Sequence, residues 1–447
     1  MLPPLVTALI GGWRLSGASL WADELATWGA IRLGWEQLWR LGGSVDAVLT
    51  PYYAALKLFV GFAGTSTVAL RLPSLVAAVL TAVVVAELGR RAAGDLAGLL
   101  AGLLWAVLPV TARYAQEARP YAVVMLLASL ALLALIRLLD RPGRGRAAAY
   151  AAAVALTGIL HPLSGLLMIA GHAVAGFRVR RSWVPAAVIG GLPAAALLLY
   201  ATRQTAQISW IHPVGVQTLR LLPAQLFVSA IAGGMVLALA VAGLRRDRIG
   251  WALAAAGFVP PALLLAAGTV AAIWVPRYVL IAIPALVVLA ARGAGSRTAW
   301  IIGLVAVLGW PAQVDIRKPA GHGQDSARIA QVITPRYRAG DVAVFADRYS
   351  NIDWAARDIW SRYLRDPRPA DVLAVTGQRV DGRFLATECP DAACLGDPPR
   401  IWVIRTDSPA DPLDHMSAAK RARIGDGYRV VQRWSYPSVG ITLMERR

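Results

Sequence analysis

Charged residues and cysteines are both scarce in this chain, and the shortage of charge excludes a class of protein. Only 16% of the 447 residues are charged, whereas 57% are hydrophobic and the mean hydropathy is +0.54. A soluble protein of this length carries a larger charged fraction and a smaller apolar one. The composition therefore excludes an ordinary soluble globular protein and indicates a chain that lies largely within a membrane.

Long apolar stretches recur from the first residue to about residue 312. A bilayer crossing needs about 20 mostly apolar residues, because the hydrocarbon core is about 30 Å thick. The first stretch has no small-residue cleavage site and little positive charge before it, so we interpret it as a retained helix and not as a signal peptide. We predict about eleven membrane-spanning stretches, at residues 1–13, 66–89, 95–113, 120–138, 147–161, 162–177, 183–201, 222–244, 250–272, 277–292 and 298–312.

Acidic residues are the scarcer charge type, with 26 Asp and Glu against 45 Lys and Arg, and the formal net charge is +19. Such an excess invites a nucleic-acid partner, but no nucleic-acid-binding motif is present. Short loops rich in Arg stay in the cytoplasm. The alternation predicts a multi-pass plasma-membrane protein with a cytoplasmic amino terminus and an extracytoplasmic carboxyl terminus. The arginines occupy every second connection between apolar stretches, at 90–91, 137–146, 178–181, 245–248 and 292–297.

The only two cysteines, Cys389 and Cys394, lie in the sequence CPDAAC near the carboxyl terminus. The arginine pattern predicts that they lie outside the cytoplasm, where disulfides persist. We predict a local disulfide between them, with free thiols or two ligands of a metal site as the alternatives. No cluster of histidines and cysteines accompanies them, so metal binding has weak support.

Residues 324–447 are charged and long enough for one small domain. The tail has neither a GxGxxG motif nor a P-loop, so nucleotide binding has no support. We therefore predict a polytopic α-helical membrane protein, with a transmembrane domain over 1–323 and an extracytoplasmic α/β domain over 324–447. Within the tail, buried strands are predicted at 341–347 and 400–406, an amphipathic helix at 352–366, and a closing pair of strands at 429–434 and 441–446.

The segment 14–65, the predicted first external loop, begins with the sequence WADELATW at residues 21–28. Tryptophan is favoured at the membrane–water interface, because its body is apolar and its N–H group is polar. The segment is therefore predicted to lie along the outer membrane surface. A helix drawn over 21–39 places four tryptophans on one side, namely Trp21, Trp28, Trp35 and Trp39.

Asp23 and Glu24 form an acidic pair within this loop, and neighbours on a helix point about 100° apart, so the two carboxyls have different jobs. We interpret Asp23 as a general base held just above the lipid, and an N-cap role is the alternative. Oxygen ligands from Asp23, Glu24 and Asp46 for a divalent cation are a weaker alternative, because nothing in their spacing demands a metal.

Further polar clusters fall at the outer ends of apolar stretches. In YAQEARPYA (114–122), Arg119 is the expected partner of an anionic donor, because Arg binds phosphate bidentately. In WVPRYVL (274–280), Arg277 has the same expected role, and an interfacial snorkel is the alternative. Candidate substrate-binding residues around these clusters are Tyr52, Tyr53, Gln116, Glu117, Tyr121, His161 and Tyr278, with interface anchoring of the tyrosines, a polar turn and a structural histidine as the alternatives.

The ordered set of motifs resembles that of the GT-C superfamily of membrane glycosyltransferases, especially its protein-mannosyltransferase-like branch. The matching pieces are WADELATW, TPYYAALKLF followed by GTSTVALRLPS, YAQEARPYA, HPLSGL and VPRYVLIAIP. The resemblance implies many transmembrane helices, a first external loop with helices along the membrane, and an inverting transfer from polyprenyl-phosphate sugars on the outer face. It also implies Asp23 as the catalytic base with Glu24 beside it, and Arg119 and Arg277 at the lipid phosphate.

One departure from that family concerns the first loop, where many relatives have His-Pro-Pro and this chain has Thr50-Pro51-Tyr52. A contact made by that histidine is missing or supplied elsewhere. The expected function is transfer of a sugar, with mannose as the expected sugar, to a cell-envelope glycolipid, polysaccharide or protein. The alternatives are a lipid or solute transporter, or a noncatalytic component of an envelope synthesis complex.

Overall fold

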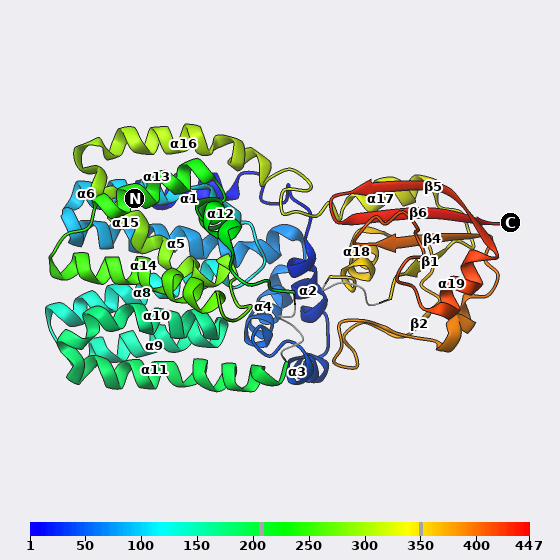
Figure 1. The fold of residues 1–447 in the computed structure, drawn as a ribbon, viewed down its shortest axis with the longest axis horizontal. Helices are drawn as coiled ribbons and strands as arrows, with labels where there is room; N and C mark the ends of the chain where they lie inside the picture. The colour runs from blue at the N-terminus through cyan, green and yellow to red at the C-terminus, as the bar shows by residue number, and fades with distance from the viewer. Residues whose placement is uncertain (205–209, 348–351) are drawn as a thin grey trace. The chain divides into compact units, whose positions relative to one another are not determined.

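The computed structural model describes residues 1–204, 210–347 and 352–447, and Figure 1 shows its helices and strands. The chain forms two compact units. Unit 1 comprises Met1–Leu15, Ala47–Ala55 and Phe62–Asp315, whereas unit 2 comprises Ser16–Asp46, Leu56–Gly61 and Ile316–Arg447. Unit 2 thus includes part of the first loop together with the tail. The domain boundary at residues 323 and 324 stays a prediction.

Unit 1 is helical, and each of the eleven predicted apolar stretches lies in a helix or a broken pair of helices. The stretch 95–113 breaks before Pro109 with a bend of 63°, and the stretch 222–244 breaks at Val228 with a bend of 92°. The helices of unit 1 are α1 (Leu2–Gly12), α5 (Thr67–Ala93), α6 (Asp95–Val107), α7 (Pro109–Ala115), α8 (Tyr121–Asp140), α9 (Arg144–Leu160), α10 (Pro162–Gly176), α11 (Arg180–Ala201), α12 (Val216–Phe227), α13 (Ala230–Ala242), α14 (Arg248–Gly268), α15 (Ile283–Ala294) and α16 (Thr298–Asp315).

Several helices of the described chain are long and apolar enough to cross a membrane. Five continuous stretches qualify, or up to seven if each bent pair counts as one crossing. Two of the five, Pro162–Gln204 and Pro276–Asp315, run for 43 and 40 residues and each contain two α-helices joined by a short 3-10 turn. The chain is therefore a multi-pass membrane protein. The number of eleven crossings and the orientation of the termini stay predictions.

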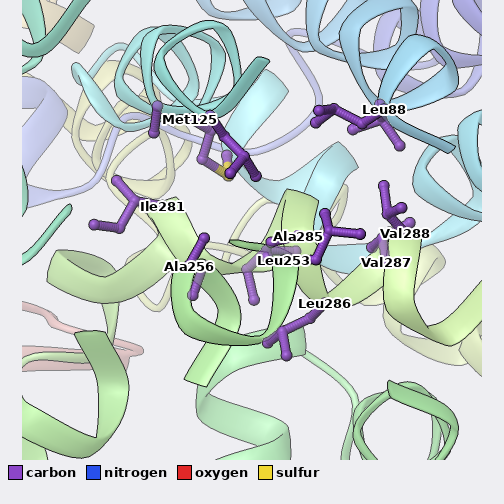
Figure 2. Close-up of a cluster of buried hydrophobic side chains, with 14 of the residues drawn as sticks. Leu88, Met125, Leu253, Ala256, Ile281, Ala285, Leu286, Val287 and Val288 are labelled. Atoms are coloured by element: carbon purple, nitrogen blue, oxygen red, sulfur yellow. The ribbon is translucent and has the colours of Figure 1, made fainter. Parts of the chain in front are cut away.

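Small residues set the packing of unit 1. A Cβ atom at Gly243, which caps α13, would collide with the carbonyl oxygen of Leu289 in α15, and one at Gly293 would collide with that of Leu239. Membrane helices associate through such close van der Waals contact. Helix α15 is buried from Ile283 to Ala291. Figure 2 shows its apolar side chains among those of α5, α8 and α14.

Unit 2 contains a four-stranded sheet of order β1-β4-β6-β5. Strand β1 (Val342–Phe345) pairs in parallel with β4 (Arg400–Arg405), β4 pairs antiparallel with β6 (Val439–Arg446), and β6 forms a hairpin with β5 (Tyr428–Tyr436). These strands and helix α18 (Ala355–Tyr363) confirm the predicted α/β tail. Sequence reasoning missed α17 (Arg328–Ile333), α19 (Ala418–Gly425), and the short strands β2 (Ala374–Thr376) and β3 (Thr387–Glu388).

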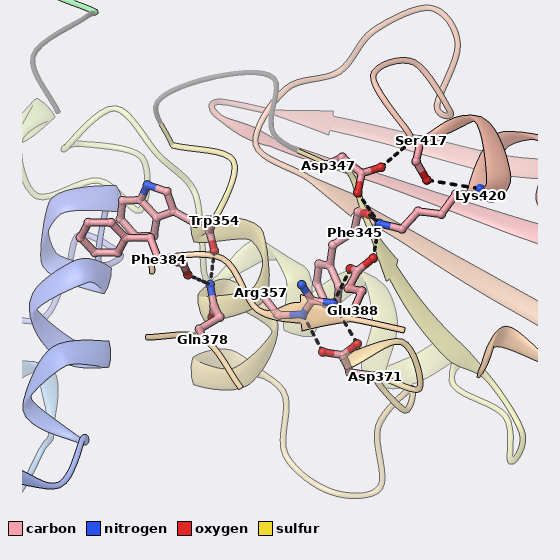
Figure 3. A network of polar contacts seen from close by, with 10 residues as sticks. All are labelled: Phe345, Asp347, Trp354, Arg357, Asp371, Gln378, Phe384, Glu388, Ser417 and Lys420. Atoms are coloured by element: carbon pink, nitrogen blue, oxygen red, sulfur yellow. Dashed lines mark hydrogen bonds and ion pairs between the residues drawn. The ribbon is translucent and has the colours of Figure 1, made fainter. Parts of the chain in front are cut away.

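A chain of ion pairs joins the elements around β1, as Figure 3 shows. Arg357 of α18 contacts Asp371 at 2.6 Å and Glu388 at 2.7 Å. Lys420 of α19 contacts Glu388 at 2.5 Å and Asp347 at 2.9 Å, and it donates to the carbonyl of Phe345 at 3.1 Å. Every charge in this chain has an opposite partner, so we interpret it as a structural network and not as a ligand site.

The first-loop segment of unit 2 differs from its prediction. The expected single helix over 21–39 is wrong, because α2 (Ala22–Ile31) ends before Gly34, which is the N-cap of α3 (Trp35–Ser44). The break separates the tryptophans: Trp28 is buried on α2, whereas Trp35 and Trp39 are exposed on α3. A single tryptophan stripe therefore does not form.

The two cysteines of unit 2 are both free, with Cys389 buried and Cys394 exposed. The backbone N–H of Cys394 donates to the Sγ atom of Cys389 at 3.1 Å, so the two residues are adjacent. The disulfide expected from the sequence is not formed in this structure and stays a prediction.

Candidate active site

The acidic pair lies in the first turn of α2, within unit 2. Trp21 is the N-cap, so the alternative that Asp23 caps this helix is wrong. The N–H of Ala22 instead donates to the Oε1 atom of Gln324 at 2.8 Å. Asp23 is half-buried, and a carboxylate in a first helical turn is favoured by the partial positive charge of the helix end.

Glu24 has a different environment from its neighbour, although one peptide bond separates them. Its side chain is fully buried, and its Oε2 atom lies 3.5 Å from the Nδ1 atom of His322, which is also fully buried. Burial of a carboxylate is costly unless a polar group lies beside it. The two acids therefore have different surroundings, as the helix geometry predicts: Asp23 is half-buried, whereas the Glu24 side chain faces the protein interior.

The weaker alternative of a divalent cation receives no support from the described residues. Across 1–204, 210–347 and 352–447, no three His, Cys, Asp or Glu side chains form a group that could hold a metal ion. Asp23, Glu24 and Asp46 are thus not gathered as a metal site.

In unit 1, Arg119 lies in the turn between α7 and α8 and is buried, as are Tyr52 and Tyr53 at the start of α4 (Thr50–Ala63). The Nη1 atom of Arg119 donates to the hydroxyl of Tyr53 at 3.2 Å. Ser74 of α5 supports the same turn, because its hydroxyl donates to the carbonyls of Glu117 at 2.6 Å and Arg119 at 3.3 Å. Ser74 therefore connects helix α5 to the turn that carries the guanidinium of Arg119.

A second cluster of unit 1 centres on His161, the residue between α9 and α10. Its Nδ1 atom accepts from the N–H of Ser164 at 3.3 Å, so a neutral ring carries its hydrogen on Nε2. The ring centroids of Tyr278 and Tyr121 lie 4.8 Å and 5.9 Å away. The guanidinium of Arg277 lies 5.3 Å over the ring of Trp210, a favourable cation–π distance.

These two clusters are close enough to influence one another. Both Arg119 and Arg277 lie within electrostatic range of His161. The segments that carry Arg119 and Arg277 thus meet at one histidine, because Tyr121 and Tyr278 from the same segments both lie beside the ring of His161. Like charges held near one another in a low-dielectric protein attract an anion.

Gln116 and Glu117, the expected sugar-binding residues, have structural contacts in unit 1. The Nε2 atom of Gln116 donates to the carbonyls of Gly11 and Trp13, each at 2.8 Å, and thereby holds the end of α1. Glu117 is buried and contacts Arg113 at 2.6 Å. Their role toward a sugar stays a prediction.

Sequence reasoning missed the residues that surround the acidic pair, above all His322 and Gln324. Both lie in the polar sequence KPAGHGQDSA, residues 318–327, which follows the last apolar helix. The stretch has no helical or strand periodicity and no known motif. A short polar segment with a lone histidine was the only signal available.

Comparisons with known proteins agree with these observations. Residues 49–203 match the family model described as dolichyl-phosphate-mannose-protein mannosyltransferase. The fold is similar to the crystal structure of ArnT from Cupriavidus metallidurans in the apo state, with a TM-score of 0.59 and 13% identity over 88% of this chain and 87% of that one. It is also similar to ArnT from the same organism bound to undecaprenyl phosphate, with a TM-score of 0.54 and 14% identity over the same shares of each chain. No curated protein sequence matches the chain.

The chain thus has the fold of the GT-C superfamily of membrane glycosyltransferases, which confirms the resemblance inferred from the motifs. The predicted fold class, a polytopic helical membrane protein with an α/β domain at its carboxyl end, is confirmed as well. Together the family match and the fold support a glycosyltransferase of the GT-C type.

Proposed function

We propose that this protein is an inverting glycosyltransferase that takes a sugar, specifically mannose, from a polyprenyl-phosphate carrier. The acceptor is a hydroxyl of a cell-envelope glycolipid, polysaccharide or protein on the outer face of the plasma membrane. Support comes from the family-model match over residues 49–203 and from the similarity to ArnT, one structure of which is bound to undecaprenyl phosphate. The observation that carries the proposal is that the segments of Arg119 and Arg277 meet at His161, since the rings of Tyr121 and Tyr278 lie 5.9 Å and 4.8 Å from the His161 ring.

The reaction needs few protein groups. The acceptor oxygen attacks the anomeric carbon, the bond from that carbon to the phosphate oxygen breaks, and the polyprenyl phosphate leaves with the bonding electron pair. The carboxylate of Asp23 accepts the hydroxyl proton as general base. Arg119 and Arg277 stabilise the negative charge that grows on the phosphate. One base suffices for inversion, because no covalent enzyme intermediate forms.

The different burial of Asp23 and Glu24 suggests different roles for these two acids. Asp23 is half-buried and can meet a substrate, whereas Glu24 is fully buried beside His322. Glu24, grouped from the sequence with Asp23 as the second catalytic residue and with an open role beside the base, is therefore proposed as a positioning residue. Around the guanidiniums, Tyr52, Tyr53, Tyr121, His161 and Tyr278 are proposed to line the donor or acceptor site.

The test is transfer of labelled mannose from polyprenyl-phosphate mannose to an envelope glycan extract, by the full-length protein in lipid nanodiscs. Asp23→Asn is expected to lower kcat by about 10²–10⁴-fold, which is the usual contribution of a general base. Asp95→Asn is the matched control, because Asp95 also lies in the first turn of a helix, α6, and is exposed. Arg277→Gln is expected to lower transfer more than Arg277→Lys does, since lysine keeps the charge but not the bidentate geometry.

Wild-type rates in Asp23→Asn would contradict its role as the base. If the wild-type protein transfers no sugar from any polyprenyl-phosphate donor, the enzyme proposal itself is wrong. The remaining alternatives would then be a transporter and a noncatalytic component of an envelope synthesis complex. Uptake of a labelled polyprenyl-phosphate lipid into vesicles would distinguish these two.

A further inference from the structure

Helix α2 carries Asp23. Residues that follow the last apolar helix form hydrogen bonds at the amino-terminal end of α2. Gln324 accepts from the N–H of Ala22 at 2.8 Å. Just before α2, the hydroxyl of Ser326 donates to the carbonyl of Leu20 at 2.7 Å, and the N–H of Leu20 donates to the hydroxyl of Tyr363 at 2.8 Å. The free N–H groups of a helix start need such partners. Here the carboxyl-terminal part of unit 2 supplies the partner of the first N–H, that of Ala22, and also fixes Leu20 just before the helix.

The same region holds one side of α2 through Glu24. His322 and Glu24 are both fully buried, with 3.5 Å between Nδ1 and Oε2. A buried carboxylate that loses its neighbouring polar group pays a desolvation cost, so this contact strongly favours one orientation of the helix turn. Because Asp23 is the preceding residue of that turn, its direction follows from that of Glu24.

The second half of α2 rests on α18 and on Arg379. A Cβ atom at Gly29 would collide with the guanidinium of Arg379, so the backbone of α2 lies directly against that group. Arg379 donates to both carboxylate oxygens of Asp358, at 2.9 Å and 2.6 Å, which fixes its plane. Its guanidinium also lies 5.3 Å from the ring of Trp354 and 5.0 Å from that of Phe384. This support is rigid, because bidentate ion pairs and stacked rings allow few orientations.

Two further side chains, those of Arg362 and Lys57, also contact α2. The guanidinium of Arg362, on α18, lies 5.6 Å from the ring of Trp28, a buried residue of α2. At the carboxyl end of the helix, the ammonium of Lys57 donates to the carbonyls of Ile31 at 3.0 Å and Leu33 at 2.7 Å. A cation at a helix carboxyl end satisfies carbonyls that have no partner within the helix.

From these contacts we infer that the carboxyl-terminal region of unit 2 is a positioning element of the active site: His322, Gln324 and Arg379 form a cradle that sets the direction of the Asp23 carboxylate. The inference rests on the proposed function for the role of Asp23. It assigns a job to the tail, which neither its composition nor its strands reveal. The cradle contacts α2 at three places: Gln324 binds the first turn, His322 lies beside Glu24, and Arg379 lies against Gly29. Rotation or translation of the helix would break at least one of these contacts.

The first test replaces His322. His322→Leu removes the polar neighbour of Glu24, and a misplaced base lowers kcat by about 10²-fold while the donor KM stays unchanged. His322→Asn keeps a polar group close to the position of Nδ1 and is expected to restore most of the lost kcat. His415→Asn is the matched control, because His415 lies 3.5 Å from Asp414 on an exposed surface and Asn tolerates its positive φ of 57°.

The second measurement does not depend on activity. Amide hydrogen exchange over residues 22–31 is expected to accelerate in His322→Leu and in Gly29→Ala, where the new methyl group displaces Arg379. Gly61→Ala is the control for the glycine change, since a Cβ atom there meets nothing within 4 Å. His322→Asn is expected to exchange like the wild type.

The outcomes separate this inference from the proposed function. Unchanged exchange over α2 in both variants would overturn the cradle, and so would a wild-type kcat in His322→Leu. Equal losses in His322→Leu and His322→Asn would also overturn it, because general destabilisation would then explain both. If the wild-type protein transfers no sugar, the proposed function fails, whereas faster exchange over α2 still supports the cradle.

Discussion

The two units are each stabilised internally by a different kind of contact. In unit 1, α13 and α15 approach so closely that a methyl group at Gly243 or Gly293 would collide with the backbone of the other helix. In unit 2, ion pairs through Arg357 and Lys420 join α18 and α19 to β3 and to the segments that follow β1 and precede β2. Lipid gives helices no hydrophobic reason to associate, so contact area must hold them. Charges buried in an α/β domain are tolerated only in pairs. Unit 1 should therefore be sensitive to added volume, and unit 2 to removed charge.

The same contrast appears in the candidate site. The guanidiniums of unit 1 for which the donor role is proposed lie beside aromatic groups, with Arg119 on the hydroxyl of Tyr53 and Arg277 over Trp210. In unit 2, Arg379 also lies beside aromatic rings, but it pairs with both carboxylate oxygens of Asp358 and supports α2. Residue type alone does not distinguish an arginine that binds a ligand from one that fixes a helix.

The largest expected effect that would test this comparison is in unit 2. Arg357→Met leaves Asp371 without its bidentate partner and removes one of the cations beside Glu388, at an expected cost of about 3–5 kcal/mol in the free energy of unfolding. Hydrogen exchange in β1 and β4 of the full-length protein, followed through urea, measures that cost for unit 2.

Arg421→Met is its control, because the ion pair of Arg421 with Asp411 is exposed. The expected cost there is about 0–1 kcal/mol. Equal costs for Arg357→Met and Arg421→Met would contradict the view that burial gives the network its importance.

A smaller effect is expected from added volume in unit 1. Gly243→Ala places a methyl group against the carbonyl of Leu289 and should cost about 1–3 kcal/mol, as overpacking usually does. The Tm of the full-length protein in detergent reports the change. Gly234→Ala, on α13 where a Cβ atom meets nothing within 4 Å, should leave the Tm unchanged or slightly higher. If Gly234→Ala lowers the Tm as much, close backbone approach is not what holds these helices.

The smallest effect concerns pH and an exposed pair. The N–H of Leu413 and the guanidinium of Arg421 lower the pKa of Asp411 below its ordinary value of 3.8. The folded state thus binds the proton more weakly than the unfolded state, so the stabilisation is complete above the ordinary value and is lost as the pH falls through the folded pKa. The gain is expected to stay below about 1 kcal/mol, because the group is exposed. Unfolding of Asp411→Asn and wild type should differ at pH 7 and no longer differ at a pH below the folded pKa of Asp411, which is itself below 3.8; an equal difference at both pH values would contradict this origin.

Much of the fold followed from the sequence, but the arrangement of the first loop did not. Apolar stretches marked the helices of unit 1, and short continuous apolar runs marked β1 and β4, because both signals are local. The helix expected over 21–39 broke at Gly34, where the backbone starts a new helix and not a continuation of α2. Helical spacing on paper cannot show such a break, because glycine is tolerated inside helices at a modest cost.

The charged residues of the candidate site could be named from the sequence, where their roles stay predictions, and the residues that support them could not. Asp23, Arg119 and Arg277 stood out because charge near long apolar stretches is costly and therefore informative. His322 gave no comparable signal, although it lies beside Glu24 in the folded chain. Nor did the sequence show that Gln116 would be used to hold the end of α1.

The sequence by itself determined that this is a membrane protein and where most of its longer helices and strands lie, and it named the acids and arginines for which roles are proposed. Composition and periodicity carry that information, since they reflect how each short segment meets lipid or water. Only the tertiary structure decided that Glu24 faces inward while Asp23 stays half-buried, and that Gln324 meets Ala22 across 302 positions. Contacts between distant segments leave no local pattern, because chain folding alone brings those residues together.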